Sequence, residues 1–264
     1  SNFGESVSIL PDDRHSVHPP VFDCFPYYVE EELLRFRVEL YKDYVDAFIL
    51  LEGNRTQAGE PKEFTALDDI QRLGLDDEII QVVHIELPEG KTLQECWARE
   101  NAQRDALSVV LQGLPEETIV ISCDCDEFFN PEHLPFLIDQ AQIHGVVHPN
   151  MILHYCRADN FATDTLGNPL DWTKATVSKL NAYKEYGTYS QMRTAPLEKR
   201  KKTLSNAIFG HHFAWFGGEE RRIKKLNSLA SQWLNTEDAM ERIKNFDMDQ
   251  VEDILGRKNQ KLQK

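Results

Sequence analysis

The chain has few of the features that mark membrane proteins, nucleic-acid-binding proteins or cysteine-rich proteins. Its 264 residues include no apolar run long enough to cross a bilayer, and no signal peptide is visible at its start. Its formal net charge of −15 argues against a protein that wraps nucleic acid, which needs a basic face. Its five cysteines form no C-x-x-C pair, so neither a zinc ribbon nor a disulfide framework is indicated.

What the chain does contain is enough apolar material for a sizeable core, together with an uneven distribution of charge. Apolar residues make up 41% of the sequence, which favours a folded domain over a disordered chain. Basic residues gather in the segments EKRKK (198–202) and EERRIKK (219–225). These segments leave room for a local anion site in an acidic protein, although solvated loop and helix faces are the simpler interpretation.

Apolar runs alternate with segments of helical period, and this alternation predicts the fold class. The apolar runs do not alternate cleanly with polar residues, which is typical of parallel strands covered on both faces. We therefore expect an α/β protein with an open, mostly parallel sheet flanked by helices. The expected strands are 21–25, 45–52, 79–87 and 118–123, and the expected helices are 30–42, 93–113 and 131–142.

The sequence predicts one domain, flanked by an N-terminal lead-in and a C-terminal tail. Residues 1–20 are polar and contain proline, so we expect an extended lead-in before a domain over 21–234. Residues 235–264 predict a C-terminal helical tail, whose first helix begins with a threonine cap. The two helices expected in this tail are 236–246 and 247–258.

The second half of the domain departs from the regular alternation. Residues 159–172 and 181–202 are rich in turn residues and aromatic residues, and they predict substrate loops over the sheet. Residues 204–218 return to strand character and are followed by a helix expected at 219–234.

An acidic cluster directly follows one of the expected strands. Residues 119–121 predict a buried strand, and Asp124, Asp126 and Glu127 come after it. Carboxylates this close repel one another unless they are protonated or bridged by a cation, and hard divalent ions prefer oxygen ligands. Because ligands bind beyond the carboxyl ends of parallel strands, the cluster predicts a metal–diphosphate site. A solvent-exposed acidic turn is the alternative.

Two charged residues, Glu100 and Arg104, lie on the apolar face of the helix expected at 93–113. They share that face with Trp97 and Leu107, where charge is costly unless it is paired. Four residues apart, they can pair with each other, or Arg104 can neutralise a phosphate or hold a site carboxylate.

Arg37 lies among leucines in the helix expected at 30–42. A buried bridge to an acid at a strand end, such as Glu52, would satisfy it, and we favour this structural role.

The segment GHHFAWFGGEERRIKK (210–225) combines histidines, a Gly-Gly turn and two acids at a helix start. Glu219 and Glu220 suit the helix macrodipole, but the same place also suits a general base that takes a proton from an acceptor hydroxyl. His211 and His212 alternate across a strand, so one of them can face the site, and His212 would then contact metal or phosphate.

Five ordered blocks of the sequence resemble glycosyltransferase family 17, which includes the β-1,4-mannosyl-glycoprotein β-1,4-N-acetylglucosaminyltransferases. The resemblance covers roughly residues 20–230 and implies a GT-A-like (Rossmann-like) fold. It also implies an inverting reaction that uses UDP-GlcNAc and a divalent metal. The blocks are VFDCFPYYVEEELLRFRVEL, YVDAFILLEGNRTQAGEPKEF, WARENAQRDAL, IVISCDCDEF and GHHFAWFGGEERRIKKLNS.

The resemblance also assigns roles by position. Asp124 and Asp126 match the aspartate pair of the family, His212 matches the histidine of a Gly-Trp-His segment, and Glu100 and Arg104 match a helix pattern. His211 stands where the family has tryptophan, and a downstream histidine of the family is missing from NSLASQW. A more distant likeness to the Gly-Gly-Glu-Asp turn of β-1,4-galactosyltransferases points to Glu220 as the base, or failing that Glu219.

These observations lead to one expected mechanism. A UDP-sugar donor lies across the strand ends near Asp23, Glu52 and Asp124, and Mn²⁺ or Mg²⁺, held chiefly by Asp126 with Asp124 and His212, bridges its diphosphate. The glutamate base activates a hydroxyl of a glycan acceptor. The aromatic residues expected to bind the acceptor are Trp172, Tyr183 and Tyr189.

Two other functions fit parts of the pattern. A sugar nucleotidyltransferase also uses aspartates and a metal, but it usually carries a Gly-rich basic loop that VFDCFPYY lacks. A relative that binds nucleotide sugar or glycan without turnover is the second. We expect no nucleic acid partner and no membrane span in this chain. The expected location is the cytoplasm of a bacterium or a virus-infected host, or the Golgi lumen if the chain derives from a trimmed eukaryotic protein.

Overall fold

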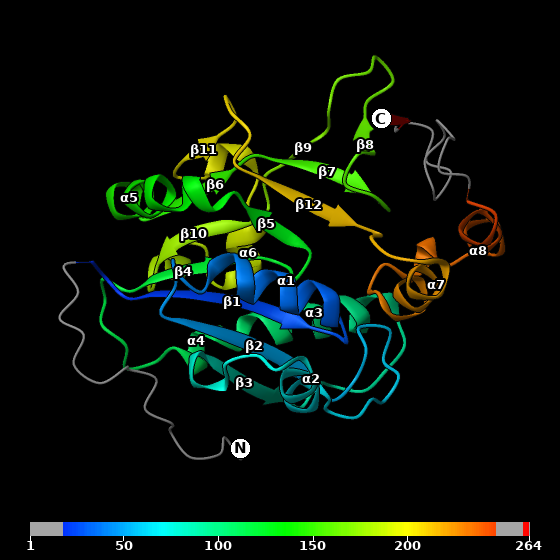
Figure 1. The fold of residues 1–264 in the computed structure, drawn as a ribbon, viewed down its shortest axis with the longest axis horizontal. Helices are drawn as coiled ribbons and strands as arrows, with labels where there is room; N and C mark the ends of the chain where they lie inside the picture. The colour runs from blue at the N-terminus through cyan, green and yellow to red at the C-terminus, as the bar shows by residue number, and fades with distance from the viewer. Residues whose placement is uncertain (1–17, 247–260, 264) are drawn as a thin grey trace.

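The computed structural model describes residues 18–246 and 261–263, which form a mixed α/β fold built on two β-sheets (Figure 1). No helix within these ranges is long and apolar enough to cross a membrane. Most of the lead-in expected at 1–20, and the whole helix expected at 247–258, lie outside the described residues.

The first sheet contains the parallel strands that the sequence predicts. In sheet order, its seven strands are β11 (Thr203–Leu204), β6 (Val146–Pro149), β10 (Thr176–Lys179), β4 (Ile119–Ser122), β1 (Val21–Tyr27), β2 (Ala47–Gly53) and β3 (Ile80–Ile85). β4, β1, β2 and β3 run parallel to one another, β11 is parallel to β6, and β10 runs antiparallel to both β4 and β6. The predicted α/β fold with an open, mostly parallel sheet is confirmed.

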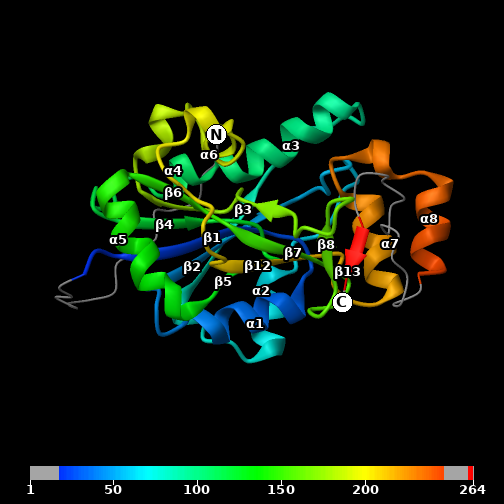
Figure 2. The ribbon, with the colours of Figure 1, turned by 90° about the horizontal axis from the view of Figure 1, so that it is seen from above.

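Helices cover both faces of this sheet (Figure 2). Successive side chains of β2 point to opposite faces, so Phe48 and Leu50 pack in one core cluster while Ile49 and Leu51 pack in another. Both faces are buried, which explains why the sequence shows continuous apolar runs. One face is covered by α1 (Glu31–Tyr41), α2 (Ala66–Leu73) and α5 (Leu134–His144), and the other by α3 (Leu93–Asp105), α4 (Leu107–Val110) and α6 (Tyr189–Arg193).

A second sheet, which the sequence analysis did not predict, lies beside the first. In sheet order, its strands are β13 (Lys261–Gln263), β8 (Phe161–Thr163), β7 (Met151–Tyr155), β12 (Gly210–Ala214) and β5 (Glu127–Phe129), with β9 (Asp171–Trp172) paired to β7. β7 and β12 are parallel, and the other pairs are antiparallel. The chain passes from β4 in the first sheet to β5 in the second through residues 123–126, so the acidic cluster occupies this crossover.

The last described helices pack at the end of the second sheet (Figure 1). α7 (Glu219–Ser228) follows β12, and α8 (Glu237–Lys244) begins after Thr236, whose hydroxyl accepts a hydrogen bond from the backbone of Ala239 as the cap prediction requires. Short 3₁₀ helices lie at Asp77–Ile79, Pro131–His133, Ala182–Glu185, Leu197–Lys199 and Gln232–Leu234.

Candidate active site

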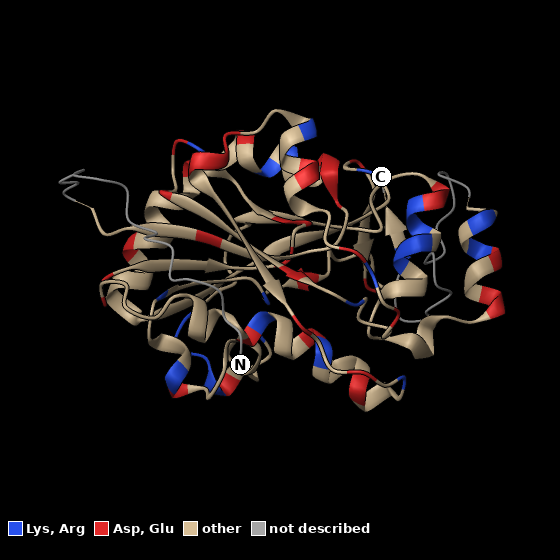
Figure 3. Ribbon diagram, turned by 90° about the horizontal axis from the view of Figure 1, so that it is seen from below, with Lys and Arg blue, Asp and Glu red and all other residues tan. Residues whose placement is uncertain are grey.

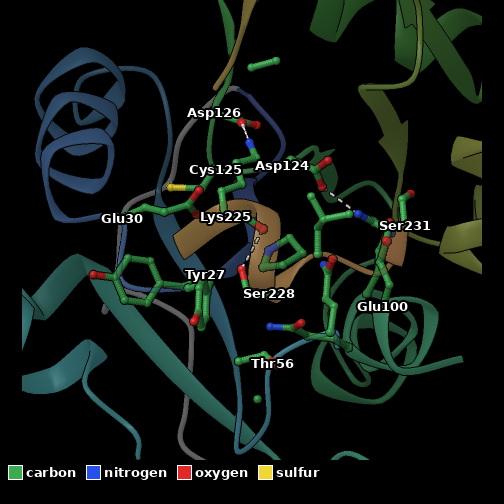
Figure 4. A pocket seen from close by; sticks show the side chains of 18 of the residues that line it. Tyr27, Glu30, Thr56, Glu100, Asp124, Cys125, Asp126, Lys225, Ser228 and Ser231 are labelled. Carbon is green, nitrogen blue, oxygen red and sulfur yellow. Dashed lines mark hydrogen bonds and ion pairs between the residues drawn. The ribbon is translucent and has the colours of Figure 1, made fainter. Parts of the chain in front are cut away.

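A cavity of about 600 Å³ lies at the carboxyl ends of β1 and β2, between the two sheets and α7 (Figure 4). Its lining comes from distant parts of the sequence, including the end of β1, the turn between β4 and β5, and α7. This is the position in an α/β sheet where ligands are expected to bind.

One wall of the cavity is a loop that follows β2. The backbone N–H of Ala58 donates to the carbonyl of Ser228 at 2.9 Å, and the side chain of Gln57 accepts a hydrogen bond from the backbone of Ala230 at 3.1 Å. The buried guanidinium of Arg99 donates to the carbonyls of Gln57 and Pro88, which fixes the loop on α3. The N-terminal and C-terminal parts of the chain are thereby tied together over the site.

The cavity gathers positive charge within an acidic protein. Among the described residues that line it, eight are Lys or Arg and four are Asp or Glu. Several of the cations belong to α7, along which basic residues recur (Figure 3). The lining therefore suits an anionic ligand more than a cationic one. The cations are Arg55, Lys62, Arg104, Lys174, Arg193, Arg221, Lys224 and Lys225, and the acids are Glu30, Glu100, Asp124 and Asp126.

Arginines of the protein compensate the first carboxylate of the acidic cluster. Arg104 and Arg193 each donate to a different oxygen of Asp124, at 2.6 Å in both cases. Burial opposes the charge of Asp124, but Arg193 and Arg104 hold the pKa of its carboxyl at about 2. Arg193 also donates two hydrogen bonds to the fully buried Glu127. Glu127 in turn accepts a hydrogen bond from the backbone N–H of Asp124 and thus fixes the turn.

Asp126 is compensated by residues of the second half of the chain. The Nζ atom of Lys225 lies 2.6 Å from its Oδ2 atom, and the Nε2 atom of His212 lies 3.4 Å from its Oδ1 atom. Burial opposes the charge, but Lys225 and His212 hold the pKa of the Asp126 carboxyl well below its usual range. The closely spaced carboxylates are therefore compensated by cations of the protein itself in this structure.

Asp23 does not line the cavity in this structure, and its expected contact with the donor stays a prediction. The side chain of Asp23 is fully buried and accepts two hydrogen bonds from Arg37, at 2.6 and 2.7 Å. Arg37 also donates to the carbonyls of Asp124 and Glu127 and thereby supports the acidic turn from behind. The predicted structural role of Arg37 is confirmed, but its partner is Asp23 and not Glu52.

The carboxylate of Glu52 caps a helix in this structure, and its expected contact with the donor stays a prediction. It is fully buried and accepts hydrogen bonds from the backbone N–H groups of Thr65 and Ala66 at the start of α2. Lys62 donates to it at 2.8 Å and completes its charge compensation.

Glu100 and Arg104 line the cavity as a pair. Their closest charged atoms are 3.6 Å apart, which confirms the ion pair that the helix spacing predicts. Burial raises the pKa of the Glu100 carboxyl, and Arg104 offsets part of this increase. Arg104 binds Asp124 as well, so the alternative role of holding a site carboxylate is confirmed together with the ion pair.

The aromatic residues expected to bind the acceptor occupy two different places. Trp172 lines the cavity, where its ring lies 4.4 Å from that of His212 and its indole N–H donates to Glu127. Tyr183 and Tyr189 stack on each other and pack in the core under α6, and the hydroxyl of Tyr189 donates to a backbone carbonyl. Trp172 is the one of the three that lines the cavity, and an acceptor contact stays a prediction for each of them.

The predicted bases Glu219 and Glu220 are exposed at the first turn of α7 and are not among the described residues that line the cavity. The face of α7 that lines it carries Arg221, Lys225 and Ser228, one helical turn apart, so the two glutamates project elsewhere. The assignment of the base to either glutamate stays a prediction, and neither side chain lines the cavity in this structure.

Three residues that line the cavity were not predicted from the sequence. Glu30 directly precedes α1, and burial together with Asp126 raises the pKa of its carboxyl to about 7. Arg193 lies in a short helix inside a predicted loop, where no periodicity distinguishes it. Lys225 belongs to the EERRIKK segment, and the cluster of basic residues there was the sequence signal that could have identified it.

Part of the cavity lining suits the binding of a divalent cation. No cluster of three or more His, Cys, Asp or Glu suited to a metal occurs among residues 18–246 and 261–263. Asp124 uses both oxygens in ion pairs with arginines, so the expectation that it binds metal does not fit this arrangement. Asp126 and His212 converge on the cavity and suit a cation that takes its other ligands from a diphosphate.

Comparisons with known proteins give the family. No curated protein matches the chain. Among solved structures, one titled a mycobacterial protein is 15% identical with a TM-score of 0.31, covering 52% of this chain and 41% of that one. Residues 1–349 of TarS from S. aureus are 14% identical with a TM-score of 0.42, covering 74% and 60% respectively, so the chain spans less than two thirds of either structure. The sequence model of glycosyltransferase family 17 matches residues 12–207, and the chain belongs to this family of glycosyltransferases.

Proposed function

We propose that the chain transfers a sugar, with GlcNAc as the expected one, from a UDP-sugar to a hydroxyl of a glycan acceptor, with inversion at the anomeric carbon. The observation that carries the proposal is the cation-rich cavity at the strand ends of a family 17 glycosyltransferase. A UDP-sugar presents two adjacent phosphates, and its departure as UDP increases the negative charge that the site must stabilise.

The basic residues of α7 are the groups that we assign to the diphosphate. Lys224 and Lys225 line the cavity on one face of α7, together with Arg221. Lys225 is held by Asp126, so its charge is positioned before the donor arrives and costs little reorganisation during the reaction. Trp172 remains our proposal for stacking on a sugar ring of the acceptor.

Metal dependence is part of the proposal. Asp126 and His212 would hold Mn²⁺ or Mg²⁺, which when bound would add positive charge at the diphosphate oxygens. Asp124 would remain paired with Arg104 and Arg193, where it positions both guanidiniums at the cavity wall.

Calorimetry with UDP, in the presence and absence of Mn²⁺, tests the donor site. We expect UDP to bind and uridine, which lacks the diphosphate, to bind far more weakly. Incubation with UDP-GlcNAc and an array of glycans, read by mass spectrometry, then tests transfer, and NMR of the product reports the anomeric configuration. Absence of UDP binding would contradict the donor assignment. Binding without transfer to any glycan would favour an inactive relative.

A further inference from the structure

Glu30 lines the cavity, and the residue before it has a backbone conformation that its residue type rarely adopts. Val29, directly before it, has a φ of 50°, in the left-handed region that disfavours β-branched residues. Such conformations persist where the surrounding structure enforces them, and they concentrate at functional sites. Here the conformation of Val29 precedes an acid that lines the site.

Glu30 also occupies the N-cap position of α1 without capping the helix. Its carbonyl accepts the first helical hydrogen bond, from Leu34, but within the described residues its side chain makes no capping hydrogen bond. A carboxylate in this position normally bonds to the free N–H groups of the first turn. The carboxylate of Glu30 instead lies in the cavity, where 18% of its side-chain surface is exposed.

Two of the three other acids that line the cavity are held more tightly than Glu30. Asp124 and Asp126 each have a cation at 2.6 Å, whereas Glu100 lies 3.6 Å from Arg104 of the same helix, a separation similar to that of Glu30 from its partner. Within the described part of the chain, the ion-pair partner of Glu30 is Arg221, at 3.7 Å, which is longer than a hydrogen bond. An acceptor hydroxyl can therefore approach Glu30 without displacing a strong partner.

We propose that Glu30 is the general base of the transfer reaction, a role that rests on the proposed function. The carboxylate of Glu30 takes the proton of the acceptor hydroxyl while the hydroxyl oxygen forms a bond to the anomeric carbon. The bond between that carbon and the diphosphate oxygen breaks, and its electron pair leaves with UDP beside the cations of α7. Glu30 then releases its proton to water.

The surroundings of Glu30 suit this role at neutral pH. Burial and the charge of Asp126 raise the pKa of Glu30 to about 7, although Lys225 and Arg221 lower it in part. A base with a pKa near the working pH combines a substantial ionised fraction with a strong tendency to accept a proton. The titratable and charged groups coupled to Glu30 are Tyr27 and Tyr28 at the end of β1, Asp124, Cys125 and Asp126 in the turn after β4, and Arg221 and Lys225 on α7.

Glu30→Gln tests the proposal, with Glu32→Gln as a matched control. Glu32 is exposed on the same helix and loses the same charge when substituted. We expect Glu30→Gln to lower kcat by about 10²–10⁴-fold, the usual contribution of a general base. UDP affinity, measured by calorimetry, should stay within about threefold, and the acid limb of the pH profile near 7 should disappear. Glu32→Gln should match the wild type.

The outcomes separate this proposal from the proposed function. A kcat of Glu30→Gln within fivefold of wild type would overturn the role of Glu30 while leaving transfer intact. An equal loss of UDP affinity and kcat would assign Glu30 to donor binding and also overturn it. If Glu30→Gln does not fold, Glu30→Asp decides, since Asp keeps the charge but withdraws the carboxylate by one methylene, and a kcat within fivefold of wild type would contradict the proposal. A wild type that transfers no sugar contradicts the proposed function itself.

Discussion

Lys225 and Asp126 form an ion pair of 2.6 Å across 99 positions of sequence, and this pair joins α7 to the turn between the two sheets. The pair places an ammonium group at the cavity wall and orients the carboxylate that the family resemblance assigns to the metal. Both the proposed diphosphate contact and the proposed metal contact therefore depend on Asp126.

If the proposed function holds, replacing Asp126 with alanine should lower UDP-sugar turnover at least 100-fold, because one substitution removes the partner of Lys225 and the proposed metal ligand. The fold should persist, since Lys225 is one-third exposed and can reach water. Binding of Mn²⁺ in the presence of UDP, followed by electron paramagnetic resonance, should weaken in the same variant. Wild-type turnover would remove Asp126 from the mechanism, and unchanged Mn²⁺ binding would remove it from the metal site.

Arg193→Ala should destabilise the fold by about 3–5 kcal/mol, because it leaves the buried Glu127 without its cation. Urea unfolding followed by circular dichroism measures this loss. Arg157→Ala offers the control, since Arg157 and its ion-pair partner Asp159 are both more than half exposed and this surface pair should contribute little to stability. A similar cost for both substitutions would mean that Arg193 is not a structural anchor of the turn.

The contribution of Asp124 to the free energy of unfolding should decrease at acidic pH. Arg193 and Arg104 lower the pKa of Asp124 in the folded state to about 2, below its unfolded value. The stabilisation, about 2 kcal/mol, is therefore present above pH 4 and is lost as the pH falls toward 2. The difference in Tm between the wild type and Asp124→Asn should shrink over this window. A difference that is constant from pH 5 to pH 2 would contradict the ion pairs.

The contribution of Glu30 to stability should depend on pH in the opposite direction to that of Asp124. Its folded-state pKa of about 7 lies above the unfolded value, so folding favours the protonated form. The contribution of Glu30 to the free energy of unfolding should fall by about 3 kcal/mol as the pH rises from 4.5 to 7, with no further loss above 7. Because Gln stays neutral, Glu30→Gln should melt at a higher temperature than the wild type above pH 7 and at a similar temperature near pH 4. A lower Tm at every pH would show that the carboxylate has a structural function.

The parallel half of the fold was predictable because burial on both faces imposes long apolar runs. β2 and β4 are buried along their whole length, and their sequences consequently contain few polar residues. The second sheet was not predictable in this way, because strands such as β5 and β9 have three and two residues, too few to show a period.

Side-chain partners were harder to predict than burial. The helical position of Arg37 indicated that its charge is buried, but the choice between Asp23 and Glu52 depends on which acid faces α1 from the sheet. Similarly, the acidic start of α7 indicated a base, whereas the helix turns its basic face to the cavity. Glu30 had no signal in the sequence, because the left-handed backbone of the preceding Val29 and the missing cap distinguish it from the neighbouring acids.

The bridge between the loop after β2 and the end of α7 has a consequence for biosynthesis. Gln57 and Ala230 meet across 173 positions, so the wall that they build is complete only after nearly the whole described chain has been made. The parallel strands β1, β2, β3 and β4 are finished by residue 122 and can assemble on the ribosome well before that point. A ligand of this cavity, such as the UDP-sugar that we propose, therefore cannot act as a template for early folding, and the complete cavity is one of the last features that the nascent protein acquires.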